Sequence, residues 1–507
     1  MNIILRHRDN ETGKKLLGLL IEMLKDVESR DTYISGFPFL EMEVKTKGSA
    51  RRILNSAASI KNCLDRETMG QILESSGISY GDKPAEMINK YYDILLFDMN
   101  VIAAKVRGGQ SNSGKYIKET ECAKIADLAR KALYILGLDY GLVTVALTGK
   151  GKTRVLDIND SPEIRNRDMN ILLNNLTTLR DMPYPSADDQ EVKIGADPEF
   201  MLLNSKSGRM MAASDFFPRA GIIGCDNIRI PNRQQRPVAE VRPQPTTSPV
   251  QLTDNIKEAL VCANKLAPYR NVRWLAGSQP LSGYSIGGHI HFSNVVLNSA
   301  LIRALDNYLG VIVFLVEDPE SAARRRKKYG RLADIRLKEY GGFEYRTLGS
   351  WLVTPEITRA VLCLAKVVAE HYLELNSVNL NNAAALQAFY KGDQEYFRPL
   401  FGKLWRELMK TPAFQNYQNE MKVIPNMIDN KITWDEHLDL RLAWNVGGSK
   451  RQYNSDVKTK KPNNNNQVLN NNRNINRRTV PTNRGRRTRS YSPEINSGPV
   501  HTTRMAP

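Results

Sequence analysis

The stretch KIGADPEFMLL, residues 193–203, decides what fold this chain is expected to have. It is a short, mostly apolar run of the kind that forms a strand. Side chains two residues apart in a strand point to the same face, so Asp197 and Glu199 would lie side by side. The stretch therefore predicts a strand that presents two carboxylates on one of its faces.

Three later stretches repeat this spacing, with two ionisable residues at positions i and i+2 of a strand-like run. They are VAEVRPQP (238–245) with Glu240 and Arg242, GGHIHFS (287–293) with His289 and His291, and GGFEYRTLGSW (341–351) with Glu344 and Arg346. One such pair could be the charged outer face of a half-buried strand. Four pairs, each beside Gly or Pro, predict strands that converge on a polar site.

The residue types in these pairs indicate the chemistry of the expected site. Several carboxylates with one or two imidazoles suit Mg²⁺ or Mn²⁺, although His289, His291 and one Glu could hold a catalytic zinc instead. Arg242, Arg346 and the run RRRKKYGRLADIR (324–336) add further cations. Metal ions and arginines beside carboxylates are what phosphoryl transfer requires. Taken alone, the basic run is more typical of a solvated helix or a nucleic-acid patch.

The ordered series of these motifs resembles a known family. The segments GADPEF, EVRP, GGHIHF, RRKKYGRLADIRLKEYGGFEYR and SWL match the glutamine-synthetase-like carboxylate–amine ligases (amidoligases) over about residues 191–370. The likeness is to the phage-encoded type 2 branch, in which an ATP-grasp-like domain can precede the ligase domain. The resemblance implies a curved antiparallel sheet that holds two or three divalent ions, Mg²⁺ or Mn²⁺, with ATP entering from one side.

The resemblance also implies a role for each matched residue. The implied metal ligands are Asp197, Glu199, Glu240, Glu344 and one of His289 or His291, with the other histidine facing phosphate or substrate. Arg346 and Arg336, beside Glu344, would stabilise the transferred γ-phosphoryl group. Arg242, Arg326 and Arg331 would contact ATP. Asp197 stands where relatives often have Glu, and the shorter side chain could shift an ion by roughly 1.5 Å.

The reaction that the resemblance implies is ATP-dependent formation of an amide or isopeptide bond through an acyl phosphate. Its partners would be small-molecule or peptide carboxylates and amines, and an oligomer would be compatible with the fold. Two alternatives stay open. One is a guanidino or amine phosphotransferase on the same scaffold. The other is a non-catalytic nucleic-acid-binding or virion-associated protein that relies on the basic C-terminal tail.

The N-terminal part alternates helix and strand patterns and ends near DMPYPSADDQ (181–190), where Pro, Ser and acids interrupt them. Apolar spacing predicts a helix over 11–27 and an amphipathic helix over 122–138 with Gly137 at its end. Strands are predicted at the short runs 93–97, 101–106, 142–148 and 153–158.

This order resembles the ATP-grasp fold over roughly residues 50–165, through RRILNSAASIKNCLDRETMGQILESSGI and ARKALYILGLDYG…VLDINDSP. The resemblance places that family's metal motif on Asp157 and Asn159 and its phosphate-contacting arginine on Arg107. Two departures reduce the likeness. Thr144 stands where an acidic residue is expected, and the segment between SSGISYG and VIAAKV is too short for the lysine-bearing central subdomain. We therefore expect a reduced ATP-grasp-like α/β domain without ATP chemistry of its own.

The expected class is α+β, in three parts: a reduced ATP-grasp-like domain (1–185), a glutamine-synthetase-like amidoligase domain (191–445) and a disordered tail (446–507). The net charge of the chain is +18, and from Lys450 onward 13 Lys and Arg face only 2 acidic residues. The tail is rich in Asn and poor in large apolar residues, so it cannot bury enough surface to fold. It would contact nucleic acid or an acidic partner, or serve only solubility.

Three further features bear on where the protein works. The five cysteines form no CxxC pair, which favours reduced thiols. The N-terminus has no apolar core long enough for a signal peptide. The longest apolar run, LGVIVFLVE (309–317), is too short to span a bilayer. We therefore expect a cytoplasmic protein without a membrane partner, in the host cytoplasm if the chain is phage-encoded.

Overall fold

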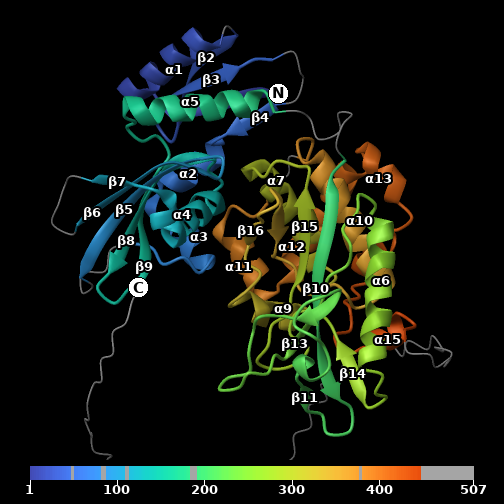
Figure 1. The fold of residues 1–507 in the computed structure, drawn as a ribbon. Helices are drawn as coiled ribbons and strands as arrows, with labels where there is room; N and C mark the ends of the chain where they lie inside the picture. Colours follow the sequence, from blue (N-terminus) through green and yellow to red (C-terminus); the bar gives the residue numbers. More distant parts are fainter. Residues whose placement is uncertain are drawn as a thin grey trace, which may run out of the picture. The chain divides into compact units, whose positions relative to one another are not determined.

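The strand predicted at 193–203 is present as β10 (Lys193–Asn204), and the largest sheet is built around it (Figure 1). This computed structural model describes residues 1–24, 26–46, 51–81, 87–108, 114–182, 191–375 and 379–446. The other strands of the sheet are β11 (Met210–Met211), β12 (Ile223–Cys225), β13 (Val238–Val241), β14 (Val272–Leu275), β15 (Gly288–Ser293), β16 (Ile335–Leu337) and β17 (Phe343–Tyr345). Among the described residues their order is β12-β13-β10-β15-β17-β16, with β11 and β14 also paired to β10. All of these pairings are antiparallel.

The alternation along β10 divides its side chains between two environments. Ile194, Phe200 and Leu202 are buried in the hydrophobic core, which is completed by α6 (Pro249–Leu266) and α10 (Pro355–His371). These two helices pack against each other beside the sheet (Figure 1). Both begin in the same way, with a Ser or Thr side chain that accepts an amide of the first turn and a Pro at the helix start. The odd-numbered positions of β10 are left for the opposite face.

The remaining helices of this half, except α9 (Pro319–Arg326), contribute residues to the same core. They are α7 (Ser299–Ala304), which continues into a π-helix, η3 (Leu305–Gly310), and α8 (Val311–Phe314), then α9, α11 (Ala383–Lys391), α12 (Gln394–Leu408), α13 (Pro412–Tyr417), α14 (Val423–Asp429) and α15 (Leu440–Ala443). A short 3₁₀ turn, η2, spans Ala213–Asp215.

The N-terminal half contains two smaller sheets. The first has the order β2-β3-β1-β4 and consists of β1 (Asn2–Arg8), β2 (Val27–Ile34), β3 (Phe37–Val44) and β4 (Arg51–Leu54), with only β1 and β4 parallel. The second is antiparallel, has the order β7-β6-β5-β8-β9 and consists of β5 (Ile88–Phe97), β6 (Asn100–Gly108), β7 (Lys115–Ile117), β8 (Tyr140–Thr148) and β9 (Thr153–Asn159).

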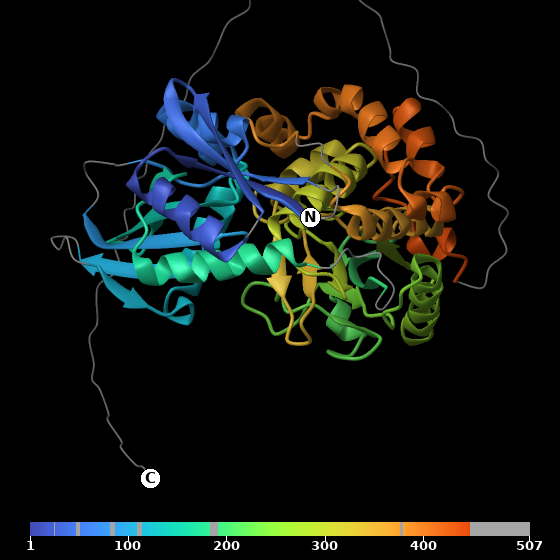
Figure 2. The same cartoon turned by 90° about the horizontal axis from the view of Figure 1, so that it is seen from above.

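Helices cover both faces of the second N-terminal sheet. One hydrophobic cluster combines it with the first sheet, α1 (Glu11–Met23) and α5 (Asn166–Arg180), and Figure 2 shows these two helices next to each other. The other face contacts α4 (Ala123–Ile135), with α2 (Ala57–Leu64), α3 (Arg66–Ser75) and the 3₁₀ turn η1 (Glu119–Glu121) nearby in the chain.

Most of the predicted N-terminal elements are confirmed. Strands lie at all four predicted runs, and α4 ends just before Gly137, whose φ of 85° suits glycine. The helix predicted over 11–27 is wrong at its end, because α1 stops at Met23 and Leu24 is already extended (φ −128°). Val27 instead pairs with Val44 at the start of β2. Sheet pairing therefore outweighs helical periodicity over the last turn of the prediction.

One hydrophobic core joins the two halves of the described chain. It includes Ile72 and Val143 from the N-terminal half together with Phe200 and Phe314 from the other, and residues 1–449 form a single compact unit. The mixture of sheets and helices confirms the α+β class, while the domain boundaries stay a prediction. The tail predicted to be disordered lies, apart from Val446, outside the described residues.

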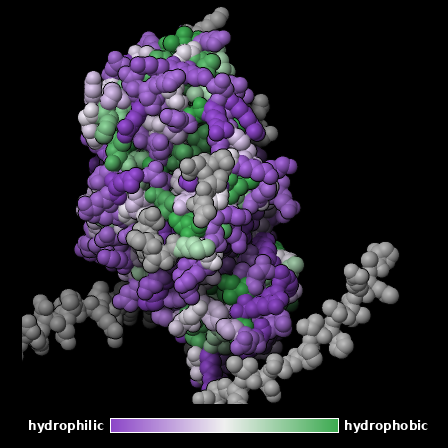
Figure 3. All heavy atoms as spheres, turned by 90° about the vertical axis from the view of Figure 1, so that its left-hand side faces the viewer, coloured by the Kyte–Doolittle hydropathy of each residue, from purple (hydrophilic) through white to green (hydrophobic). Residues whose placement is uncertain are grey.

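Hydrophilic residues cover most of the face drawn in Figure 3, with hydrophobic residues in smaller groups between them. No helix in the described ranges is long and apolar enough to cross a membrane.

Candidate functional site

The register of the large sheet brings the four predicted residue pairs onto one face. Residues directly opposite each other in antiparallel strands share a face. The opposed pairs are Asp197 with His289, Gly195 with His291, Glu199 with Glu240, His291 with Glu344, and Arg336 with Glu344. The predicted convergence of these strands is therefore present in the fold, and it follows from the pairing of β13, β10, β15, β17 and β16.

A cavity of about 1020 Å³ lies over this face. Of the residues predicted for the site, those that line it are Asp197, Glu199, Glu240, Arg242, His289, His291, Arg336, Glu344 and Arg346. This volume is at the upper end of the range for small-molecule sites. The cavity is thus large enough for a nucleotide together with a second reactant.

Asp197, His291 and Glu344 form a group of ligand-type atoms in the cavity that could hold a metal ion. One such atom from each residue lies within 4.8 Å of the others, and His291 Nε2 is 3.0 Å from Asp197 Oδ2. Within the described chain, Asp197 Oδ1, His291 Nε2 and Glu344 Oε1 are buried without a hydrogen-bond partner. Buried polar atoms normally have one. Two carboxylates and an imidazole that contact one another and form no hydrogen bond through these atoms fit a divalent cation such as Mg²⁺ or Mn²⁺.

Glu344 is the most heavily neutralised carboxylate of the site. It is fully buried, and Oε1 lies 3.1 Å from Arg346 Nε and 3.3 Å from His289 Nδ1. Oε2 lies 3.2 Å from the Arg336 guanidinium and pairs with Lys338. A buried carboxylate surrounded by cations stays ionised, so these cations are held together at one point of the cavity wall.

The ionisation of the group follows from its mixed charges. Burial alone would raise the pKa of Asp197, but the imidazoles of His289 and His291 outweigh it and hold that pKa below its usual range. Burial acts in the same way on Glu344, and the charges of His289 and Lys338 lower its pKa. Burial would lower the pKa of His289, but Asp197 and the other carboxylates raise it. The centre of the site is therefore ionic at neutral pH.

Glu199 and Glu240 form a second carboxylate pair on neighbouring strands. Glu199 accepts the Gly287 amide at 2.6 Å, and Glu240 accepts Arg242 at 2.6 Å. Burial raises the pKa of Glu199 to about 8, and burial together with the Asp197 charge raises the pKa of Glu240 to about 7. This end of the cavity wall is short of positive charge, and a bound cation would supply it.

The two histidines differ in their surroundings. His289 directs Nδ1 to Asp197 (3.2 Å) and Glu344, while its Nε2 packs against Gly287, where a Cβ would be only 2.4 Å away. A Cβ on Gly288 would meet the Gly349 carbonyl and the Trp351 ring at 2.5 Å. The glycines of GGHIHFS therefore give the His289 ring and the neighbouring backbone room. His291, and not His289, belongs to the ligand group with Asp197 and Glu344.

Arg325 lines the cavity and was missed by the sequence analysis. It is buried and donates to the carbonyls of Thr347 (2.8 Å) and Arg346 (3.1 Å). Gly330, at φ 67°, gives it room, because a Cβ there would lie 1.8 Å from the guanidinium. Burial, followed by the charge of Arg326, lowers the pKa of Arg325 to about 10. Its place in a run of three arginines gave no sign of which one faces the cavity.

Three arginines predicted to contact nucleotide lie away from this cavity lining. Arg326 pairs with Glu317 and stacks on Phe389, 4.2 Å from the ring centroid. Arg331 reaches the carbonyl of Gly77 at 3.4 Å. Arg107, on β6, lies 4.1 Å over the ring of Tyr91. The structure brings Arg242, Arg336 and Arg346 together and leaves these three elsewhere.

The ATP-grasp resemblance singles out four residues of the second N-terminal sheet: Arg107, Thr144, Asp157 and Asn159. Each of them contacts a nearby polar or charged group. Thr144 donates to Asp93 at 2.8 Å, and Arg107 lies 3.5 Å from the same carboxylate. Asp157, opposite Thr144, lies 3.7 Å from Arg66, and Asn159 accepts the Ser161 amide. The polar groups here are satisfied mainly by each other.

Comparison with known families gives one match. Residues 194–446 match the family model described as "Phage phiEco32-like COOH.NH2 ligase-type 2". That range contains the whole eight-stranded sheet apart from Lys193, and it includes the cavity-wall residues Asp197, Glu199, Glu240, Arg242, His289, His291, Arg325, Arg336, Glu344 and Arg346. Comparison with curated proteins finds no match.

Solved structures give only remote likenesses. They include the ATP-grasp ligase PsnB complexed with minimal precursor (13% identity, TM-score 0.21, 25% of this chain and 65% of that one) and the macrocyclase MdnB from Microcystis aeruginosa MRC (10%, 0.23, 35% and 97%). A third is a RiPP-associated ATP-grasp ligase of Chryseobacterium gregarium, with ADP and a leader and core peptide (9%, 0.16, 36% and 55%). The chain thus spans less than two thirds of the first and third of these proteins.

Proposed function

We propose that the chain is an ATP-dependent ligase and that the cavity over β10 is its active site, because residues 194–446 match the phage phiEco32-like carboxylate–amine ligases of type 2. The observation that carries this proposal is the grouping of Asp197, His291 and Glu344 beside Arg336 and Arg346 in a cavity of about 1020 Å³. The product would be an amide or isopeptide bond, formed from a small-molecule or peptide carboxylate and an amine.

Asp197, His291 and Glu344 would hold a divalent cation, Mg²⁺ or Mn²⁺, and Glu199 and Glu240 would contribute to a second site beside it. A cation bound there would neutralise phosphate oxygens of ATP and stabilise charge in the transition state. His289 would keep the Asp197 and Glu344 carboxylates in place from the protein side, because its Nδ1 lies between them.

The reaction would run in two steps. In the first, an oxygen of the substrate carboxylate attacks the γ-phosphorus of ATP and the bond from that phosphorus to the β,γ-bridging oxygen breaks. ADP leaves, and the substrate becomes an acyl phosphate. In the second, the amine attacks the acyl carbon, phosphate leaves and the nitrogen gives up a proton. Arg346 and Arg336 would stabilise the charge of the γ-phosphoryl group during transfer, since both already converge on Glu344. Arg242 would contact nucleotide from the other end of the wall.

We extend the proposal to the architecture. The eight-stranded antiparallel sheet would correspond to the glutamine-synthetase-like sheet, within a domain of residues 191–445. Residues 1–185 would be a reduced ATP-grasp-like domain without a nucleotide site of its own, because Asp93, Arg107 and Thr144 already satisfy each other. Arg326, Arg331 and Arg107 would then have structural roles in place of the ATP contacts that the resemblance implied.

The test is ATP turnover by the full chain, screened with Mg²⁺ or Mn²⁺ against amino acids, polyamines and peptides, with the product identified by mass. Glu344→Gln removes the charge at which the cations converge, so it should reduce metal-dependent phosphate release by about 10³-fold or more. Glu339→Gln, an exposed position on the same hairpin, is the matched control and should leave the rate unchanged. Equal turnover by both variants would refute the proposed site.

The mass of the product separates the alternatives. A phosphorylated guanidine or amine without an amide would indicate a phosphotransferase on this scaffold. The nucleic-acid-binding alternative depends on the basic tail, which apart from Val446 lies outside the described residues, and it predicts salt-sensitive binding that is lost when 446–507 are deleted.

A further inference from the structure

Asp306 is a fully buried carboxylate outside the proposed active site, within the π-helix η3. It accepts hydrogen bonds from Tyr134 Oη (2.7 Å), Tyr345 Oη (2.8 Å) and the Ala333 amide (2.9 Å). No Lys or Arg in the described ranges forms an ion pair with it. Burying a charge with only neutral partners is costly, and π-helical turns are frequent at functional sites. These features call for an explanation beyond packing.

The three closest donors to Asp306 come from three different parts of the chain, and a fourth, Thr347 Oγ1, lies at 3.5 Å. Tyr134 lies on α4 in the N-terminal half, and Tyr345 is the last residue of β17. Ala333 sits at φ 54°, in the left-handed region, within the segment that leads into β16. One carboxylate therefore joins the N-terminal half to two segments of the cavity wall.

The contacts of Asp306 reach the proposed catalytic residues through the backbone. Tyr345 lies between Glu344 and Arg346 in sequence, and its side chain points to the side opposite theirs, as neighbours on a strand do. The Arg346 amide donates to the Asp334 carbonyl at 2.8 Å, one residue from Ala333. Asp306 thus holds both segments next to that backbone contact: Tyr345 precedes Arg346, and Ala333 precedes Asp334. Moving Asp306 would move the strand end that carries Glu344 and Arg346.

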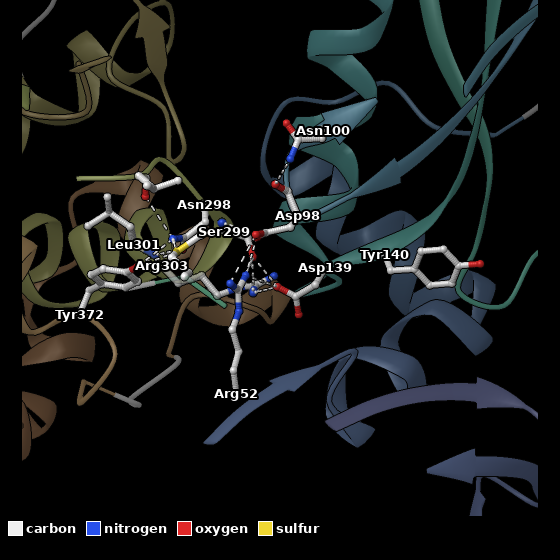
Figure 4. Close-up of polar contacts among 12 residues, drawn as sticks. Arg52, Asp98, Asn100, Asp139, Tyr140, Asn298, Ser299, Leu301, Arg303 and Tyr372 are labelled. Atoms are coloured by element: carbon white, nitrogen blue, oxygen red, sulfur yellow. Dashed lines mark hydrogen bonds and ion pairs between the residues drawn. The ribbon is translucent and has the colours of Figure 1, made fainter. Parts of the chain in front are cut away.

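The helix that carries Asp306 is also fixed to the N-terminal half at its other end. Figure 4 shows Arg52, Asp98 and Asp139 directed toward Ser299 and Arg303 of α7. The Ser299 amide donates to Asp98 at 2.9 Å, and the Arg303 guanidinium pairs with Asp139 and donates to the Leu138 carbonyl at 2.9 Å. The continuous helix α7–η3 is therefore held by the N-terminal half at Ser299 and Arg303, and again at Asp306.

We propose that Asp306 is a positioning residue of the ligase site, through which Tyr134 and the N-terminal half fix the strand end that carries Glu344 and Arg346. This inference rests on the proposed function, because it assigns the N-terminal half a role in the geometry of the same cavity. In this role the N-terminal half contributes no group that touches substrate. It supplies a hydroxyl that holds Asp306, and Asp306 holds the strand end through Tyr345.

The test uses the full chain with Tyr134→Phe, which removes only the hydroxyl that reaches Asp306. The matched control is Tyr140→Phe, because Tyr140 is another buried tyrosine of the N-terminal half and its hydroxyl has no partner among the described residues. Two quantities are measured: the affinity for Mn²⁺ alone by calorimetry, and hydrogen–deuterium exchange of the backbone amides in 331–347. Tyr134→Phe should weaken Mn²⁺ binding about fivefold and speed exchange in 331–347, and Tyr140→Phe should change neither.

The outcomes separate the inference from the proposed function. If the unaltered chain binds Mn²⁺ and Tyr134→Phe matches Tyr140→Phe in both measurements, the positioning role is refuted, even if the melting temperature falls. If the unaltered chain binds no Mn²⁺, the proposed active site fails and the inference fails with it. Tyr345→Phe should reproduce the effect of Tyr134→Phe from the other side of Asp306, and an unchanged affinity there would also overturn the inference.

Discussion

The wall of the proposed ligase cavity and the polar face of the second N-terminal sheet are built on the same plan, with ionisable residues at alternate positions of antiparallel strands. They differ in whether the polar atoms of those residues have hydrogen-bond partners. In the cavity wall, Asp197 Oδ1, His291 Nε2 and Glu344 Oε1 are buried and have ion-pair neighbours at 3.0–3.3 Å, but they form no hydrogen bond with the described residues. On the N-terminal sheet, Asp93 is occupied by Thr144 and Arg107. Alternating charged residues therefore indicate a ligand site only where their buried polar atoms form no hydrogen bonds within the protein.

Burial separates the two regions as clearly as hydrogen bonding does. The side chain of Glu344 is 1% exposed, whereas that of Asp157 is 48% exposed. An exposed carboxylate is stabilised by water and needs no cation, while a buried one must be paired or must bind a metal ion. Glu344 meets this requirement through Arg336, Lys338 and Arg346, so the two regions differ in how strongly their carboxylates must be paired.

The largest expected difference between the two regions is in catalysis. Arg346→Ala removes a guanidinium that faces the proposed γ-phosphoryl position, so ATP turnover should fall about 10²–10³-fold. Arg107→Ala removes the corresponding arginine of the N-terminal sheet and should change the rate less than about twofold, as expected for a surface group. Steady-state phosphate release by both variants measures this. A large loss in Arg107→Ala would mean that the N-terminal sheet holds nucleotide after all.

A second expected difference is in the pH dependence of stability. Burial raises the pKa of Asp306 to about 6 from its ordinary value of 3.8, against the effect of its Tyr134 and Tyr345 hydrogen bonds. Between these two values the folded chain keeps a proton that the unfolded chain has lost, so stability falls as the pH rises. The contribution is complete below about pH 4 and is lost above about pH 6. Across the window it is about 3 kcal/mol at most.

Asp306→Asn does not titrate, so it isolates this effect. The free energy of unfolding of the unaltered chain, relative to that of Asp306→Asn, should fall by about 1 kcal/mol between pH 5 and pH 7. Denaturant unfolding at several pH values in that range measures the difference. The contribution of Asp139 to the free energy of unfolding should depend on pH in the opposite direction. Burial alone would raise its pKa, but Arg303 and Arg52 outweigh burial and lower it, so its contribution is lost as the pH falls. A flat difference for Asp306→Asn would show that Asp306 is not a buried acid with a raised pKa.

Much of the site was predictable from the sequence, because the i, i+2 spacing of GADPEF, EVRP, GGHIHFS and FEYR fixes which side chains share a face. The register between the strands was not predictable. Which residue lies opposite Asp197 depends on the loops that connect the strands, and these loops carry no such pattern. Arg325 could not be separated from Arg326 for a related reason. The two are neighbours in α9, and only the tertiary contacts direct one to the cavity and the other to Phe389.

Asp306 shows a further limit of sequence reasoning. It stands just before the run LGVIVFLVE, where a single acid looks like the polar edge of an apolar helix. Its partners Tyr134 and Tyr345 are 172 and 39 residues away in the chain. Its role is visible only once α4 and β17 are packed on the same helix.

The last expected difference concerns the glycines that make the close packing of the cavity wall possible. A Cβ at Gly287 would lie 2.4 Å from His289 Nε2, and the ring cannot turn aside without releasing Asp197 or Glu344. Gly287→Ala should therefore lower the free energy of unfolding by about 1–3 kcal/mol and weaken Mn²⁺ binding, whereas Gly18→Ala, in α1 with nothing within 4 Å, should raise it by about 0.5–1 kcal/mol. Denaturant unfolding and calorimetry of both variants test this. If Gly287→Ala is as stable as the unaltered chain and binds Mn²⁺ normally, His289 is free to move and does not fix the carboxylates, and the cavity wall is no more constrained than the N-terminal sheet.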